Sequence, residues 1–100
     1  MKLPKKLTIC GKTFAVKYDK TRADGSCDLA SMVMTIGTAI PADVMETIIH
    51  ESLESIMVLR GNHYRVYQEG NDKILMAMDH SAFENVVKDL VPVIQSIYGR

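Results

Sequence analysis

The chain has 100 residues, 47% of them hydrophobic, and its 12 Lys and Arg residues balance 12 Asp and Glu residues. This length suits one modest hydrophobic core, so we expect residues 1–100 to form a single domain. The zero net charge and the lack of a stripe of basic and aromatic residues argue against nucleic acid as a partner. No apolar stretch has the length of a secretion signal or a membrane span, so we expect no membrane partner.

Cysteine usage favours a reducing compartment. Cys10 and Cys27 are the only two cysteines, whereas a secreted domain of this size usually carries more crosslinks. We therefore expect a cytoplasmic protein. Both cysteines fall in predicted strands rather than in a closely spaced pair, and we interpret them as small buried residues rather than metal ligands.

The first third of the chain has the alternating pattern of β-strands. Apolar residues alternate from Leu7 to Tyr18 on both sides of Gly11, which predicts a half-buried hairpin with Gly11 in its turn. The polar residues 19–26 indicate a loop, and the alternation that resumes over 27–36 predicts a second pair of strands.

Two helices are predicted in the rest of the chain, separated by a hairpin. Pro41 suits a first helical turn, and apolar residues then recur at helical spacing to about Leu59. Short strands are predicted over 64–67 and 74–78, and Ser81 with Glu84 has the spacing of a capping box for the last helix. This order predicts an α+β fold, with a small antiparallel sheet and two main helices packed on one face.

A possible catalytic arrangement lies in the middle of the first helix. His50 and Glu54 are four residues apart and therefore project from one helix face, one turn apart, where both side chains can bind one metal ion. Glu51 points about 100° further round the helix, where its carboxylate can reach a water molecule at the ion without binding the ion itself. This is the spacing of the His-Glu-x-x-His zinc motif with a carboxylate in place of the second histidine, and Zn²⁺ accepts carboxylate oxygen.

The same residues have a simpler interpretation. Asp43, Glu46, His50 and Glu54 are also what the hydrated face of an amphipathic helix presents, since the apolar stripe lies on the opposite side. An open catalytic cleft would leave this face equally polar, so the pattern does not separate the two interpretations.

A catalytic zinc site needs a third protein ligand, and His63, His80 and Glu84 are the candidates after the helix. His80 is favoured because a short hairpin can return the chain to the first helix just before the last one. Glu84 already has a local partner in Ser81, and His63 would have to fold back sharply.

The run from Met45 to Glu51, preceded by a strand that ends in Thr35-Ile36, resembles small phage-encoded zincin-like metallopeptidases. The likeness covers most of the chain and includes the lysine-rich first strand pair, residues 5–18, and a last helix over 81–98. The departure is Glu54, where histidine is commoner. His80 would then restore a set of two imidazoles and one carboxylate.

The resemblance implies a zinc-dependent metallopeptidase of phage type, which would act on a peptide or protein in the host cytoplasm. His50, Glu54 and His80 would bind Zn²⁺, and Glu51 would be the general base that takes a proton from the attacking water. The strand over 32–36 would pair with an extended peptide substrate. The alternative is a noncatalytic phage accessory domain that keeps this fold and binds a host or virion protein.

Overall fold

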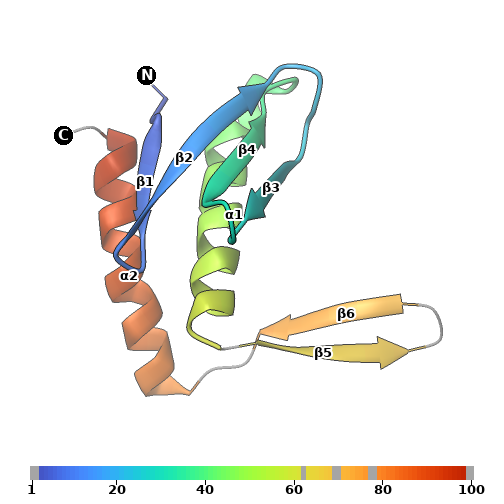
Figure 1. Ribbon diagram of the computed structural model, residues 1–100, viewed down its shortest axis with the longest axis vertical. Coiled ribbons are helices and arrows are strands. Elements are labelled where there is room, and N and C mark those ends of the chain that lie inside the picture. Colours follow the sequence, from blue (N-terminus) through green and yellow to red (C-terminus); the bar gives the residue numbers. More distant parts are fainter. Residues whose placement is uncertain (1–2, 62, 69–70, 77–78, 99–100) are drawn as a thin grey trace.

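The computed structural model describes residues 3–61, 63–68, 71–76 and 79–98, and only the backbone over 63–68 and 71–76. Four strands come first in the chain, and Figure 1 shows their arrangement. They are β1 (Lys6–Ile9), β2 (Lys12–Asp19), β3 (Gly25–Asp28) and β4 (Val33–Gly37). A short 3-10 helix η1 (Pro41–Asp43) leads into α1 (Val44–Leu59), and the hairpin of β5 (His63–Gln68) and β6 (Asn71–Met76) separates α1 from α2 (His80–Tyr98).

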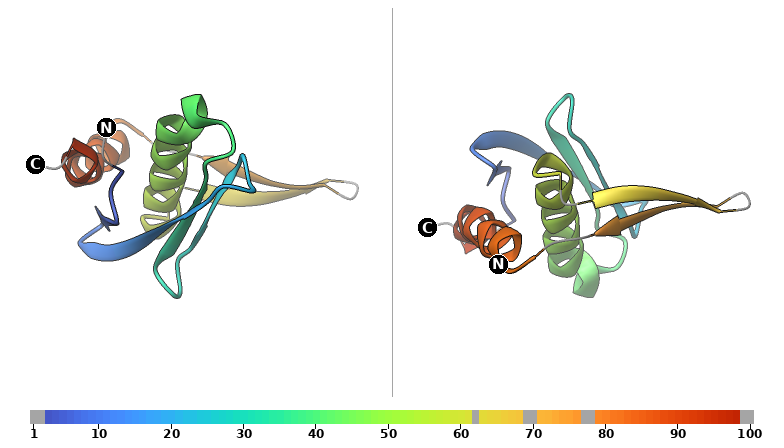
Figure 2. Two further views of the ribbon diagram at one scale, coloured as in Figure 1. Left: turned by 90° about the horizontal axis from the view of Figure 1, so that it is seen from above. Right: turned by 90° about the horizontal axis from the view of Figure 1, so that it is seen from below.

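The first four strands form one sheet in the order β1-β2-β4-β3. β1 and β2 are antiparallel, and so are β3 and β4, whereas β2 and β4 are parallel, with Ala15 opposite Val33. β4 is therefore inserted between β2 and β3, and β3 is a free edge of this sheet within the described chain. Seen from above and below, both helices lie on one side of the sheet and the β5–β6 hairpin extends away from it (Figure 2).

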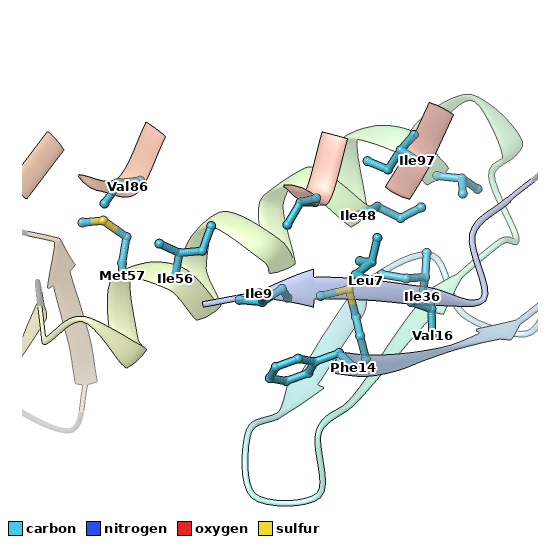
Figure 3. Close-up of a cluster of buried hydrophobic side chains, with 13 residues drawn as sticks. Leu7, Ile9, Phe14, Val16, Ile36, Ile48, Ile56, Met57, Val86 and Ile97 are labelled. Carbon is cyan, nitrogen blue, oxygen red and sulfur yellow. The ribbon is translucent and has the colours of Figure 1, made fainter. Parts of the chain in front are cut away.

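Alternating side chains of the sheet face the two helices and form one core (Figure 3). Its buried members are Leu7, Ile9, Phe14, Val16, Met34, Ile36, Val44, Ile48, Ile56, Met57, Val86, Val93 and Ile97. The alternate residues Lys6, Thr13, Ala15 and Lys17 of β1 and β2 are exposed on the other face. One face of the sheet is thus covered and the other is hydrated, as is common for sheets with antiparallel edges.

A polar contact fastens the first hairpin to both helices. Cys10 and Gly11 form the two-residue turn, with φ angles of 51° and 75°. The Cys10 thiol donates to Oδ2 of Asp89 in α2 at 3.3 Å, and Arg60, just after α1, donates to the same carboxylate oxygen. The Arg60 guanidinium holds the pKa of the Asp89 carboxyl below its usual value, whereas burial and Asp89 raise the pKa of the Cys10 thiol to about 11. Cys10 is therefore an uncharged thiol that holds the turn in place.

The structure confirms the predicted α+β class and the three strand pairs and two helices in their predicted order. The sheet is mixed rather than wholly antiparallel, because β4 pairs with β2 in parallel. The predicted capping box at Ser81 is wrong: Asp79 Oδ1 accepts the backbone N–H of Ala82 at 2.9 Å, and α2 begins at His80. Residues 69–70 of the predicted turn and 77–78 of the predicted strand lie outside the described residues. Neither described helix is both long enough and apolar enough to cross a bilayer.

We expect Phe14→Ala to lower the free energy of unfolding by about 3–5 kcal/mol, because the ring is fully buried at the centre of the core. Urea denaturation measures this loss. Val91→Ala, at a half-exposed position of α2, is the control and should change stability by no more than about 0.5 kcal/mol. Equal effects of the two substitutions would contradict the assigned core.

Candidate functional site

The motif residues of α1 lie where the helix passes the β3 edge of the sheet. His50 and Glu54 project toward solvent, with side chains 65% and 44% exposed, and His50 Nε2 lies 3.4 Å from Glu54 Oε2. Helical geometry produces this approach, since residues four apart are neighbours on the helix surface. One imidazole nitrogen and one carboxylate oxygen are thus held side by side at an open surface.

Glu51 differs from its two neighbours because it is buried. Its side chain is only 10% exposed, and its Oε2 lies 3.9 Å from His50 Nε2. Among the side chains that the structure describes, none donates a hydrogen bond to this carboxylate. Burial raises the pKa of the Glu51 carboxyl, and the negative charge of Glu54 raises it further. A buried carboxyl group without a hydrogen-bond donor costs stability, and such groups are concentrated at functional sites.

Two pockets flank Glu51, each with a volume of about 330 Å³. The first, which we call the acidic pocket, is lined by Asp24, Gly25, Glu46, Thr47, His50 and Glu51. The second, which we call the strand pocket, is lined by Gly25, Ser26, Cys27, Leu29, Glu51, Glu54, Ser55 and Val58. Because Gly25 and Glu51 line both, the two pockets form one cleft along the junction of β3 and α1.

The cleft depends on a close approach of β3 to α1 at Gly25. A Cβ atom at this position would lie 2.7 Å from Thr47 Cγ2 and 3.0 Å from Glu51 Cγ. Any larger residue would therefore push the strand away from the helix or displace the Glu51 side chain. The absence of a side chain at Gly25 is what allows the strand edge to lie directly beside the buried carboxyl group.

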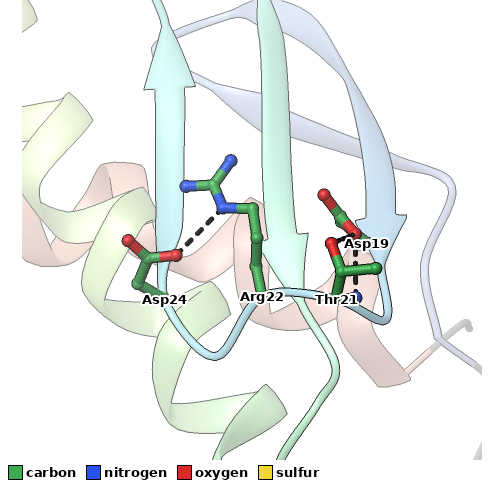
Figure 4. Close-up of polar contacts among 4 residues, drawn as sticks. All are labelled: Asp19, Thr21, Arg22 and Asp24. Atoms are coloured by element: carbon green, nitrogen blue, oxygen red, sulfur yellow. Dashed lines mark hydrogen bonds and ion pairs between the residues drawn. The ribbon is translucent and has the colours of Figure 1, made fainter.

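Polar contacts order the loop that leads into β3 (Figure 4). Asp19 Oδ1 accepts the backbone N–H of Thr21 at 2.9 Å and its hydroxyl at 2.6 Å, and Arg22 Nε donates to Asp24 Oδ1 at 2.9 Å. The Asp24 carbonyl accepts the backbone N–H of Gly37 at 2.7 Å, which ties the loop to the end of β4. These contacts fix Asp24 at the rim of the acidic pocket.

The strand predicted to receive a peptide is not the one at the edge. β4, which corresponds to the predicted strand over 32–36, is paired on both sides with β2 and β3, so its backbone groups are already used. β3 has the free edge, and it is also the strand that borders the cleft. An added strand would therefore pair with β3.

The structure brings His50, Glu51 and Glu54 together but leaves His80 apart from them. His80 opens α2 with its side chain 85% exposed, and its Nδ1 lies 3.4 Å from Oε1 of Glu84. In the part of the chain with described side chains, no group of three potential metal ligands is found. The side chain of His63, another candidate, lies outside that part. The roles of His50, Glu54 and His80 as zinc ligands and of Glu51 as general base therefore stay predictions.

The residues that line the cleft on the side of β3 were not identified from the sequence. Cys27 was predicted to be a small buried residue, and it is half-buried in the strand pocket, where burial raises the pKa of its thiol. Asp24 and Gly25 were predicted only as part of a loop. The sequence signal was present in Gly25, since a glycine at the start of a strand often marks a close backbone approach.

No protein-family model, curated protein or solved structure matches the chain at a significant level. The resemblance to phage zincin-like proteins therefore rests on the motif residues themselves.

We expect Gly25→Ala to destabilise the protein by roughly 1–3 kcal/mol, because the new methyl group would be forced against Thr47 and Glu51. Chemical denaturation measures the loss. The double variant Gly25→Ala/Thr47→Ser removes the Cγ2 atom that makes the shortest contact and should recover part of it. Additive effects of the two substitutions would show that Gly25 does not pack against Thr47.

Proposed function

We propose that the chain is a zinc-dependent peptidase whose reacting centre is the cleft between β3 and α1. The observation that carries the proposal is the arrangement around His50: carboxylate oxygens of the exposed Glu54 and of the buried Glu51 lie 3.4 Å and 3.9 Å from its Nε2 atom. A hydrated helix face would explain the exposed pair of His50 and Glu54 equally well. It would not explain why Glu51 is buried beside two pockets and receives no hydrogen bond from a described side chain.

The exposed pair has the donor types and the spacing for zinc. Two ligands about 2.0–2.1 Å from a tetrahedral Zn²⁺ lie about 3.3–3.4 Å from each other. His50 Nε2 and Glu54 Oε2 are 3.4 Å apart, so the two atoms fit neighbouring corners of such a site. We propose His50 and Glu54 as two ligands and retain His80 as the third, which requires the start of α2 to approach α1. A bound Zn²⁺ would acidify water and polarise a substrate carbonyl group.

Glu51 has the properties of the general base. It follows His50 directly in the helix and therefore lies beside the proposed ligands without sharing their face. Its raised pKa makes the carboxylate a stronger base than an exposed glutamate, which suits the removal of a proton from an attacking water molecule. The same carboxyl group can then return the proton to the leaving amine.

The free edge of β3 supports a peptide as the substrate. An extended peptide that pairs with this edge would use the unpaired backbone groups of β3 and would lie across the cleft next to Glu51. The edge would serve a noncatalytic binding domain equally well, so hydrolysis has to be measured as well as binding.

We expect purified protein to bind about one zinc ion per chain more tightly than micromolar, and His50→Ala to abolish this binding. Competition with a chromogenic chelator measures the affinity. Glu54→Ala should weaken binding more than the roughly 10- to 100-fold loss of an outer-shell partner, whereas Glu54→His should retain the metal. His80→Ala tests the third ligand in the same titration.

Helix content measured by circular dichroism is the control for all four variants. His80→Ala protein with unchanged affinity would remove His80 from the ligand set. Wild-type protein that takes up no zinc at micromolar concentration would contradict the metal site as a whole.

We expect Glu51→Gln to retain zinc and lose peptide hydrolysis, because an amide cannot accept the proton. The variant should also be more stable at neutral pH. Since the pKa of Glu51 is higher in the folded protein than in the unfolded chain, its contribution to stability is present at low pH and is lost as the pH rises through the folded pKa. The variant should therefore raise Tm at pH 7 and raise it by less at pH 4.

Two measurements test this pair of effects: turnover of a peptide library and thermal denaturation at both pH values. Glu84→Gln is the matched control for stability, because it removes an exposed helical carboxylate that does not line the cleft. Equal turnover by wild type and Glu51→Gln would exclude Glu51 as the base. No turnover by either protein, with zinc bound, would favour the noncatalytic binding domain.

A further inference from the structure

The acidic pocket differs from the strand pocket in its lining. It contains the carboxyl groups of Asp24, Glu46 and Glu51. The strand pocket shares Glu51 and adds Glu54, but it also contains the apolar side chains of Leu29 and Val58. A substrate that extends along β3 would therefore meet two environments, one on each side of Glu51.

The charges of the acidic pocket are only partly balanced. Arg22 pairs with Asp24 at 2.9 Å, and both side chains are largely open to solvent. Among the side chains that the structure describes, no Lys, Arg or His pairs with Glu46, which lines the pocket one turn before His50. The Glu51 side chain, nine-tenths buried, opens into the same pocket without a hydrogen bond from any described side chain. A positively charged group placed in this pocket would interact with the carboxylates of Glu46 and Glu51, to which no described side chain donates a hydrogen bond.

We propose that the acidic pocket binds a lysine or arginine side chain of a peptide paired with β3, and that Glu46 determines this specificity. The inference deepens the proposed function, since it rests on the same cleft and names its substrate class. A volume of about 330 Å³ accommodates one long side chain. Nucleic acid and acidic peptides are disfavoured in the same pocket, because their negative charges would face those of Asp24 and Glu46.

Peptide binding tests the proposal without relying on catalysis. Three fluorescently labelled peptides with strand-forming sequences are compared: acetyl-Thr-Val-Lys-Val-Thr-amide and its analogues with norleucine or glutamate in place of lysine. Fluorescence anisotropy is measured with the full chain in the presence of a chelator that prevents turnover. Norleucine keeps the apolar stem of lysine and removes only the charge, so the comparison isolates the electrostatic part of binding.

We expect the lysine peptide to bind roughly fivefold more tightly than the norleucine peptide at low ionic strength, and this preference to shrink as salt is added. Glu46→Gln should lower the ratio, and Glu46→Lys should invert the preference between the lysine and glutamate peptides. Glu84→Gln is the matched control, because it removes an exposed helical carboxylate that does not line the cleft, and it should leave the ratio unchanged.

Equal affinity of wild type for the lysine and norleucine peptides would overturn the proposal, and so would no binding of any peptide up to millimolar concentration. Equally tight binding of free lysine amide would also overturn it, because that would indicate a site for small cations rather than for a peptide. The two proposals fail separately. Hydrolysis without a charge preference would support the peptidase proposal and contradict the lysine or arginine specificity. A charge preference without hydrolysis or zinc binding would support the specificity and contradict the peptidase proposal.

Discussion

The packing of α1 against two different parts of the sheet determines both the core and the cleft. One strip of the helix, which contains Ile48 and Ile56, is buried among the apolar side chains of the sheet and α2. The adjacent strip, which contains Glu51 and Ser55, lies against β3. Because both strips belong to one rigid helix, the depth at which Ile48 packs also sets the position of Glu51.

Burial has opposite effects on the two strips. For Ile48 and Ile56 it removes apolar area from water and stabilises the fold. For Glu51 it removes a carboxyl group from water, raises its pKa and lowers stability at neutral pH. The same helix thus carries, on two adjacent strips, apolar side chains whose burial stabilises the fold and an acid whose burial destabilises it. A buried acid that lowers the stability of the folded protein is typical of functional sites, where activity and stability often conflict.

Much of the fold follows from apolar patterns within short segments of the sequence. The alternation over residues 7–18, the helical spacing after Pro41 and the apolar run after Ser81 predict elements that the structure contains, because each depends on which face of a local element is buried. The parallel pairing of β2 with β4 is different. Both antiparallel and parallel arrangements bury the same alternate residues, so periodicity does not choose between them, and β3 rather than β4 becomes the edge.

In the candidate site, too, some features follow from the local sequence and others depend on distant parts of the chain. The proximity of His50 to Glu54 is a property of any helix and could be predicted, whereas the burial of Glu51 depends on β3, which is distant in sequence. The same limit applies to His80. Its position depends on the end of α1, the β5–β6 hairpin and the start of α2, none of which has a pattern that specifies its orientation.

The insertion of β4 between β2 and β3 also has a consequence for the order of folding. The hairpins β1–β2 and β3–β4 join neighbouring segments, and hairpins of this kind close in about 1–10 μs. Pairing of β2 with β4 closes a longer loop, which contains all of β3, and it has to wait until the chain between them has turned back. The cleft borders β3, and β3 joins the sheet only through β4. The cleft is therefore complete only once the β3–β4 hairpin has paired with β2 through β4.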